Sequence, residues 1–168
     1  FDFSVPEDAM LITGFAKVFF TSWNKLTTVD GMPLPSLYIN NKAGGLIYHR
    51  DFAAHAAKLD VNDHLRLAST FNGLALIMKQ LSPVRGSSQM NSLEADGFAL
   101  QSFDTLTGLK FFITADPDSR HLDAVLREVY VLYSDYVLKN PFYELDMPIQ
   151  CEKFDDRVQK LAADYNRR

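Results

Sequence analysis

The sequence has 168 residues, with 17 Lys and Arg against 21 Asp and Glu, which gives a formal charge of −4. At this length, 47% hydrophobic and 12% aromatic residues are enough for one compact core, so a wholly disordered chain is excluded. The acidic balance, with a pI of about 5.5, and the lack of a basic run argue against binding to a nucleic-acid backbone.

The cysteine content and hydropathy indicate an intracellular chain without a membrane span. Cys151 is the single cysteine, so neither an internal disulfide nor a cysteine-based zinc site can form. The apolar stretch at residues 10–23 is interrupted by Lys17 and Thr21 and is shorter than the ~20 residues that cross a bilayer. We expect a reduced, cytoplasmic protein with no transmembrane or secretory segment.

A turn-rich segment separates the first part of the chain from the rest. Residues 30–35 combine a glycine and two prolines directly before a strong strand signal. We therefore expect residues 1–31 to be an N-terminal extension of unknown role and residues 32–168 to be the folded domain. Within the extension, residues 15–20 have a strand-like pattern without an obvious partner strand.

Residues 37–48 are typical of a β-hairpin, and a helix is predicted after it. Two short β-branched and aromatic runs, 37–39 and 46–48, flank Asn and Gly residues that tolerate positive φ. The helix is expected to start at an Asn62 N-cap and to end before Pro83. Its apolar positions recur every three or four residues, at Leu67, Phe71, Leu74, Met78 and Leu81.

Glycine inside this helix requires a reason, because Gly73 costs ~1 kcal/mol relative to alanine. We expect it to allow a close approach of another backbone segment.

A surface loop is predicted at residues 84–92. A second hairpin follows at 98–103 and 110–115, with a weaker strand just before Asp96.

Two helices are predicted in the last third of the chain. The first is expected to start in the cluster at residues 116–119, to end at Asn140 before Pro141, and to be the longest helix. Its apolar stripe consists of Leu122, Val125, Leu126, Val129, Leu132, Tyr133, Tyr136 and Val137. The second is a short terminal helix with apolar positions at Phe154, Val158, Leu161 and Tyr165.

Strands that are neighbours in sequence and joined by tight turns form antiparallel pairs. The order of two strands, a helix, two or three strands and two helices therefore predicts an α+β fold, an antiparallel sheet covered by helices.

No motif for catalysis or for metal binding is apparent. Gly44 and Gly45 lie inside a hairpin and lack the Lys and Ser or Thr of a phosphate-binding loop. The four histidines do not have the helical spacing of metal ligands, so we interpret them as surface or packing residues. Cys151 has no local base, and we interpret it as a packing thiol.

Two pairs of aspartates have structural explanations. Asp116 and Asp118, like Asp155 and Asp156, lie where helices are expected to begin, and carboxylates are favourable at helix N-termini. A small acid-dependent hydrolase built on these pairs is a minor hypothesis. We predict no catalytic, cofactor-binding or metal-binding residue.

Apolar side chains beside the main stripe of the long helix suggest a surface for protein partners. Tyr130, Val131, Ser134 and Leu138 form a second, partly apolar face. The nonhelical segment 140–149 is rich in aromatic and aliphatic residues. Composition leaves two interpretations open: the segment closes the core, or it is a partner surface.

Several blocks of this sequence resemble the sybindin-like family. They are residues 38–48, 80–83 and 101–110, and above all residues 135–155, which read DYVLKNPFYELDMPIQCEKFD. The resemblance implies a longin-like (SNARE-like) fold, with a five-stranded antiparallel sheet between one helix on one face and two on the other. Residues 1–31 have no counterpart in the family pattern.

The resemblance also implies a function. Members act as non-catalytic core subunits of the TRAPP vesicle-tethering complex, a guanine nucleotide exchange factor for a Rab-family GTPase in transport from endoplasmic reticulum to Golgi. The implied partners are other TRAPP subunits and the GTPase, with no nucleic acid and no cofactor. Membrane contact is expected only peripherally, through the complex, at the cis-Golgi and endoplasmic reticulum.

By similarity, the partner surface is expected at one set of residues near the end of the long helix. They are Tyr133, Tyr136, Asn140, Pro141, Phe142, Tyr143, Asp146, Met147 and Cys151. The alternative is a stand-alone longin-like adaptor that binds a SNARE or peptide segment.

Overall fold

Two hairpins provide four of the five strands. The structure is a computed structural model that describes residues 36–52, 60–81, 91–95 and 98–167. Strands β1 (Ser36–Asn40) and β2 (Leu46–Asp51) form the first hairpin, and β4 (Phe98–Asp104) and β5 (Lys110–Ala115) form the second. Each turn contains a glycine with positive φ, Gly44 at 88° and Gly108 at 92°. Both predicted hairpins are confirmed.

The weaker strand before Asp96 is also confirmed, as β3 (Ser92–Ala95), which pairs antiparallel with β4. The expected extension at residues 1–31, its strand-like run at 15–20 and its boundary with the folded domain lie outside the described residues. Most of the expected loop at 84–92 does so too.

The strand order is β2-β1-β5-β4-β3, with every pair antiparallel. The two hairpins join through β1 and β5, where Ser36 lies opposite Thr114 and Asn40 opposite Lys110. Because β1 is internal and both faces of the sheet are covered, all five of its residues are buried.

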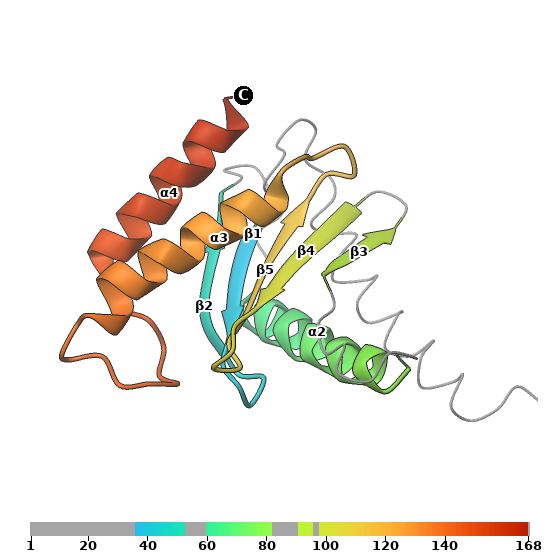
Figure 1. Cartoon of the computed structure of the whole chain (residues 1–168), viewed down its shortest axis with the longest axis horizontal. Helices are drawn as coiled ribbons and strands as arrows, with labels where there is room; N and C mark the ends of the chain where they lie inside the picture. Colours follow the sequence, from blue (N-terminus) through green and yellow to red (C-terminus); the bar gives the residue numbers. More distant parts are fainter. Residues whose placement is uncertain (1–35, 53–59, 82–90, 96–97, 168) are drawn as a thin grey trace, which may run out of the picture.

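Helices cover both faces of the sheet, as Figure 1 shows. The helix α2 (Val61–Leu81) lies on one face, and α3 (Leu122–Leu132) and α4 (Glu152–Asn166) lie on the other. This confirms the expected α+β fold with one helix on one side and two on the other.

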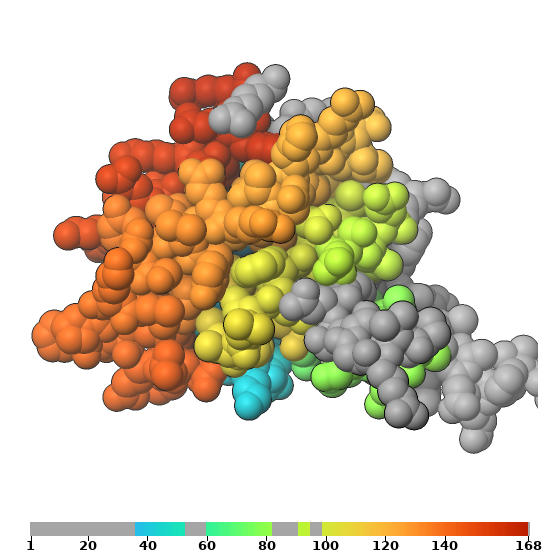
Figure 2. Space-filling view, viewed as in Figure 1, coloured from blue at the N-terminus to red at the C-terminus, as the bar shows by residue number. Residues whose placement is uncertain are grey.

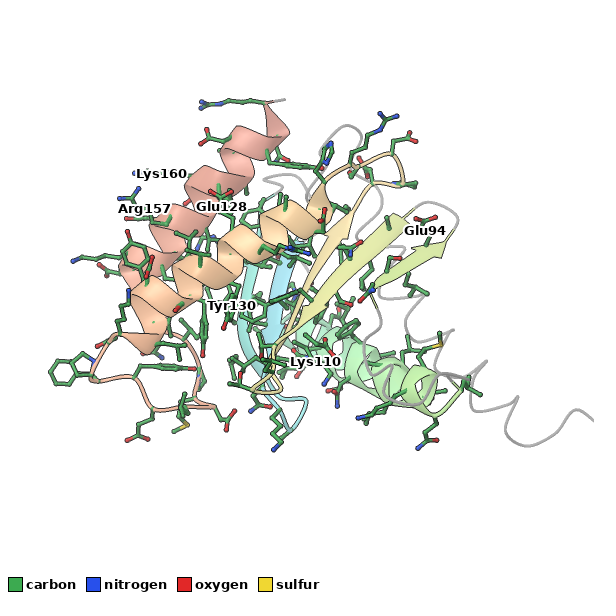
Figure 3. All side chains as sticks on the ribbon, in the orientation of Figure 1. Glu94, Lys110, Glu128, Tyr130, Arg157 and Lys160 are labelled. Atoms are coloured by element: carbon green, nitrogen blue, oxygen red, sulfur yellow. The ribbon has the colours of Figure 1, made fainter. Side chains whose placement is uncertain are left out.

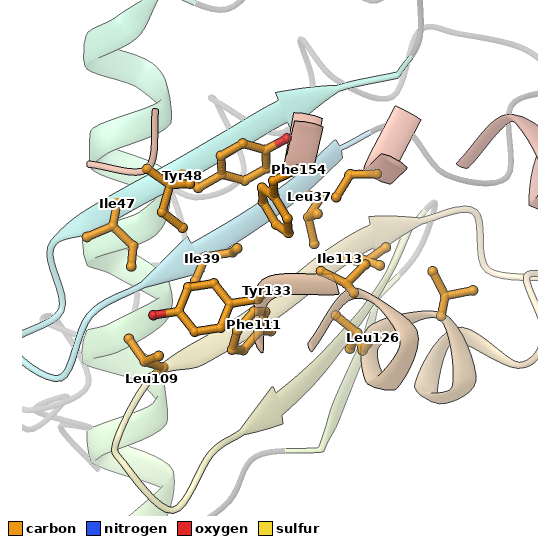
Figure 4. Close-up of a cluster of buried hydrophobic side chains, with 14 of the residues drawn as sticks. Leu37, Ile39, Ile47, Tyr48, Leu109, Phe111, Ile113, Leu126, Tyr133 and Phe154 are labelled. Atoms are coloured by element: carbon orange, nitrogen blue, oxygen red, sulfur yellow. The ribbon is translucent and has the colours of Figure 1, made fainter. Parts of the chain in front are cut away.

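The core has two parts, one on each face of the sheet. Leu37, Ile39 and Phe111 point toward α3 and α4 and contact Tyr133 and Phe154 (Figure 4). The smaller part, under α2, contains Tyr38, Leu67, Ala68, Phe71, Leu100 and Phe112. There the ring of Phe71 stacks on Phe112 with centroids 4.1 Å apart. Alternation along β1 and β5 thus supplies both cores.

Two predicted helix starts were wrong by one to several residues. Helix α2 begins at Val61 and not after an Asn62 cap, because the carbonyl of Asp60 accepts the first helical hydrogen bond, from His64 N at 3.2 Å. Helix α3 begins at Leu122, after His121 in a left-handed conformation with φ of 61°. The 116–119 cluster instead forms a turn, in which Ser119 N donates to Asp116 O at 3.0 Å.

The predicted single helix up to Asn140 is in fact two segments. The α-helix α3 has 11 residues, and the wider π-helical turns of η1 (Tyr133–Leu138) add 6 more. Among the helices in the described part of the chain, α2, with 21 residues, is therefore the longest. Tyr133 and Val137 remain buried in η1, so the apolar stripe continues through the change in helix type.

The second half of α2 also differs from prediction. After Ala75 no residue of this helix is buried, and Met78 and Leu81 are 50% and 69% exposed. Gly73 does not mediate a close approach, since among the described residues no neighbouring atom lies within 4 Å of a Cβ built on it. The apolar spacing predicted the helix correctly but not how far the sheet reaches beneath it.

Candidate partner-binding surfaces

The segment between η1 and α4 is an ordered loop held by its own hydrogen bonds. Asn140 begins a turn: its side-chain oxygen accepts from Phe142 N, and its carbonyl accepts from Tyr143 N, both at 3.1 Å. The hydroxyl of Tyr143 donates to Met147 O at 3.1 Å across the loop. Asp146 adopts a positive φ of 69°. These contacts fix the loop conformation without burying most of its side chains.

Several contacts connect this loop to the domain. The backbone N–H of Ile149 donates to Ile47 O of β2 at 2.8 Å, and the Ile149 side chain is buried. Asn41, in the first hairpin turn, contacts Asp146 O at 3.5 Å. The thiol of Cys151 donates to Tyr136 O at 3.7 Å. The loop projects beyond the sheet and the helices as the orange segment at lower left in Figures 1 and 2.

Large apolar side chains gather on the outside of this loop. Phe142 is 92% exposed, Leu145 72% and Met147 54%. Leu138, at the end of η1, is 44% exposed. A shallow groove of about 340 Å³ runs beside Phe142 and Met147. Clustered exposed apolar side chains on an ordered loop are typical of a protein-binding surface. We call Leu138, Phe142, Leu145 and Met147 the loop surface.

The residues expected at the partner surface fall into three groups. Tyr133 is 1% exposed and packs on Phe111, so its expected place on the surface is wrong: the stripe of α3 carries it into the core. Three are half-buried against the core, namely Tyr136, Tyr143 and Cys151. Of the rest, Asn140 is half-buried in the turn that it begins, and Pro141, Phe142, Asp146 and Met147 are exposed. Leu145, in the same segment, was missed.

The pKa values of Tyr133 and Tyr143 in this region are raised. Burial, followed by the nearby Tyr143, raises the pKa of Tyr133 above its ordinary value. Burial also raises the pKa of Tyr143. Both hydroxyls therefore stay neutral near neutral pH, as structural groups do.

The aspartate pairs have structural roles rather than the geometry of an acid–base pair. Asp155 accepts hydrogen bonds from Tyr48 and Arg50, both at 2.6 Å, and so fixes the start of α4 against β2. Burial and the charge of Asp118 raise the pKa of Asp116 above its ordinary value.

Two histidines meet in a way the sequence did not indicate. The rings of His49 and His64 lie 4.3 Å apart, and the buried His64 contacts Tyr38 at 3.1 Å and Asp51 at 3.5 Å. His64 is the packing histidine that the sequence suggested. Within the described ranges, no group of three or more His, Cys, Asp and Glu side chains could hold a metal ion.

A second exposed apolar surface lies on the outer side of α2. Val61, Leu65 and Leu76 are 63%, 45% and 52% exposed. Residues 67–78 of this helix contain no charged side chain. A surface helix in an outer layer normally carries charged residues on its solvent side. We call Val61, Leu65 and Leu76 the α2 surface; the helical spacing alone could not show that it faces outward.

None of the helices that the structure describes combines the length and apolarity that a membrane span requires.

Comparison with known protein families matches residues 34–165 to the sybindin-like family. The chain belongs to the sybindin-like family. Of the elements that the structure describes, the match covers all five strands, α2, α3, η1 and α4 except its last residue, so the features described above are features of a sybindin-like domain.

Individual relatives agree with this assignment. The chain is 50% identical over 133 residues to trafficking protein particle complex subunit 4 of Dictyostelium discoideum. The aligned region covers 79% of this chain and 98% of that protein. It is 51% identical over 137 residues to the protein of the same name from Bos taurus, and spans 60% of its length. The chain is also similar to a solved structure of the gliding protein MglB from Thermus thermophilus, with 12% identity, a TM-score of 0.43 and an alignment over 89% of each chain.

Proposed function

We propose that this chain is a non-catalytic subunit of the trafficking protein particle (TRAPP) complex. In that complex it contributes to guanine nucleotide exchange on a Rab-family GTPase in transport from endoplasmic reticulum to Golgi. The observation that carries the proposal is the 50% identity over 98% of a relative with the name of subunit 4. The chain then acts at cis-Golgi and endoplasmic reticulum membranes, peripherally and through the complex.

The two exposed apolar surfaces support a role in assembly. Both consist of large side chains on ordered backbone, and they belong to different elements, the loop after η1 and helix α2. A subunit that contacts two different partners needs two contact surfaces, and the described part of the chain has two candidates. The proposed partner residues are now Tyr136, Asn140, Pro141, Phe142, Tyr143, Leu145, Asp146, Met147 and Cys151, without the buried Tyr133.

Exchange activity requires no reacting group on this chain. An exchange factor binds the nucleotide-free GTPase more tightly than the loaded form, and this difference in affinity drives nucleotide release. Well-shaped, rigid surfaces can supply such a difference in affinity. The chain's part is to present the loop surface and the α2 surface in a fixed relation across the sheet.

Reconstitution tests the proposal. Partner subunits are assembled with and without this chain, and the release of fluorescent GDP from the Rab is measured. We expect slower release without the chain, and also with a Phe142→Ala, Leu145→Ser double variant. Leu106→Ser is the matched control, because Leu106 is fully exposed in the β4–β5 turn, outside both surfaces.

Two outcomes would contradict the proposal. Unchanged GDP release on omission of the chain would remove the exchange role. A chain that stays alone in the presence of all partner subunits would remove the assembly role and favour a stand-alone adaptor that binds a SNARE or peptide segment.

A further inference from the structure

A groove lies between the beginning of α3 and the end of α4, away from both apolar surfaces. Its volume is about 520 Å³, and its lining includes residues 118–121 and side chains of both helices. The buried Val125 and the half-buried Leu161 and Tyr165 supply its apolar part. The Tyr165 hydroxyl donates to Arg120 O, so the end of α4 is tied to the segment before α3.

Acidic side chains surround this apolar part. Asp118, Glu128 and Asp164 line the groove, and all three are exposed. Among the residues that the structure describes, Asp118 and Glu128 form no ion pair, and Asp164 has only a long contact of 3.9 Å with the exposed Arg167. Glu128 lies beside α4 in Figure 3. Against these three carboxylates the lining contributes one permanent cation, Arg120.

An apolar floor with an acidic rim has a specific chemical complement. Lys and Arg side chains bury their aliphatic stems on apolar surface while the charged head stays near solvent. A purely apolar ligand would desolvate the carboxylates without pairing them, and an anion would be repelled. A volume of about 520 Å³ holds one such side chain and parts of its neighbours in an extended segment.

We propose that this groove binds a Lys or Arg residue of a linear segment in a partner protein. The aliphatic stem packs on Val125, Leu161 and the Tyr165 ring, and the cation lies among Asp118, Glu128 and Asp164. This site does not depend on the proposed function, because the groove is formed within the single chain and shares no residue with the loop surface or the α2 surface.

Selection from a peptide library tests the site. A display library of random heptapeptides is selected on the full chain and counter-selected on Ala124→Gln, since Ala124 is an exposed lining residue and a longer neutral side chain there fills the groove. We expect enriched peptides to carry Lys or Arg next to an aliphatic residue. Their affinity is then measured by fluorescence polarisation.

Matched variants identify the contacts. Replacing the basic residue of an enriched peptide by norleucine, which keeps the stem and removes the charge, is expected to weaken binding about tenfold. The Glu128→Gln, Asp164→Asn double variant should weaken it by a similar factor, and added salt should weaken it further. Asp123→Asn with Asp156→Asn is the control, because it makes the same charge change on α3 and α4 outside the groove.

Three results would overturn the proposal: no peptide enriched, enriched peptides without a basic residue, or equal binding to the wild type and to the carboxylate variant. Thermal unfolding shows whether each variant is folded, and the carboxylate variant remains informative if Ala124→Gln fails to fold. The measurement uses the chain alone, so its failure leaves the reconstitution test of complex assembly untouched.

Discussion

Replacement of Phe142 by alanine separates the two interpretations of the 140–149 segment. The side chain is 92% exposed in the chain, so its removal should leave the free energy of unfolding of the isolated protein within about 0.5 kcal/mol of wild type. Covering a phenylalanine removes about 150–250 Å² from water, which at ~25 cal/mol per Å² corresponds to about 4–6 kcal/mol. Ordering and incomplete fit reduce the expected loss of binding to about 1–4 kcal/mol.

The assay has two readouts. Urea unfolding of the free chain gives the stability, and titration of immobilised partner subunits gives the dissociation constant. Leu106→Ser serves as control, since it removes an equally exposed apolar side chain elsewhere. Lower stability with unchanged binding would refute the reasoning, because Phe142 would then be a core residue. Unchanged values in both would show that Phe142 contacts no partner.

Three further predictions concern the fold. Phe71→Ala should lower the free energy of unfolding by about 3–5 kcal/mol in urea denaturation, because its ring fills the core under α2 against Phe112. Tyr48→Phe should cost about 1–2 kcal/mol in the same assay, because it removes the hydrogen bond to Asp155. Burial and then the adjacent histidine lower the pKa of His49 below its ordinary 6.5, so the unfolded chain binds the proton more readily. The contribution of His49 to the free energy of unfolding is therefore fully present above pH 6.5 and is lost as the pH falls below it. We expect His49→Asn to flatten the decline of the urea midpoint between about pH 7.5 and about pH 5.5.

Local patterns in the sequence predicted most of the elements. The glycines at 44 and 108 mark turns with positive φ, and the alternating runs beside them became paired strands. The three- and four-residue spacings correctly predicted helices in all three regions. These features depend on neighbours in the chain, which is why they can be read from one sequence.

Features that depend on distant contacts could not be predicted in this way. The pairing of β1 with β5 joins strands about seventy residues apart, and no local signal specifies it. The burial of Tyr133 follows from the packing of η1 against the sheet, although its position in the apolar stripe was already consistent with the core. The groove between α3 and α4 combines residues 118–128 with 161–165, so it exists only in the folded chain.

Gly73 connects the fold to the proposed assembly. Among the described residues, no neighbouring atom lies within 4 Å of a Cβ at this position, so Gly73→Ala should stabilise the protein by about 0.5–1 kcal/mol through helix propensity alone. The open space beside Gly73 leaves room for another backbone to approach α2 in a complex. We therefore expect the same substitution to weaken assembly with partner subunits while raising the urea midpoint of the free chain. The exposed α2 residue Ser69, replaced by alanine, is the control for helix propensity without added bulk. A stabilised Gly73→Ala chain that assembles as tightly as wild type would show that no partner backbone approaches α2 at this residue.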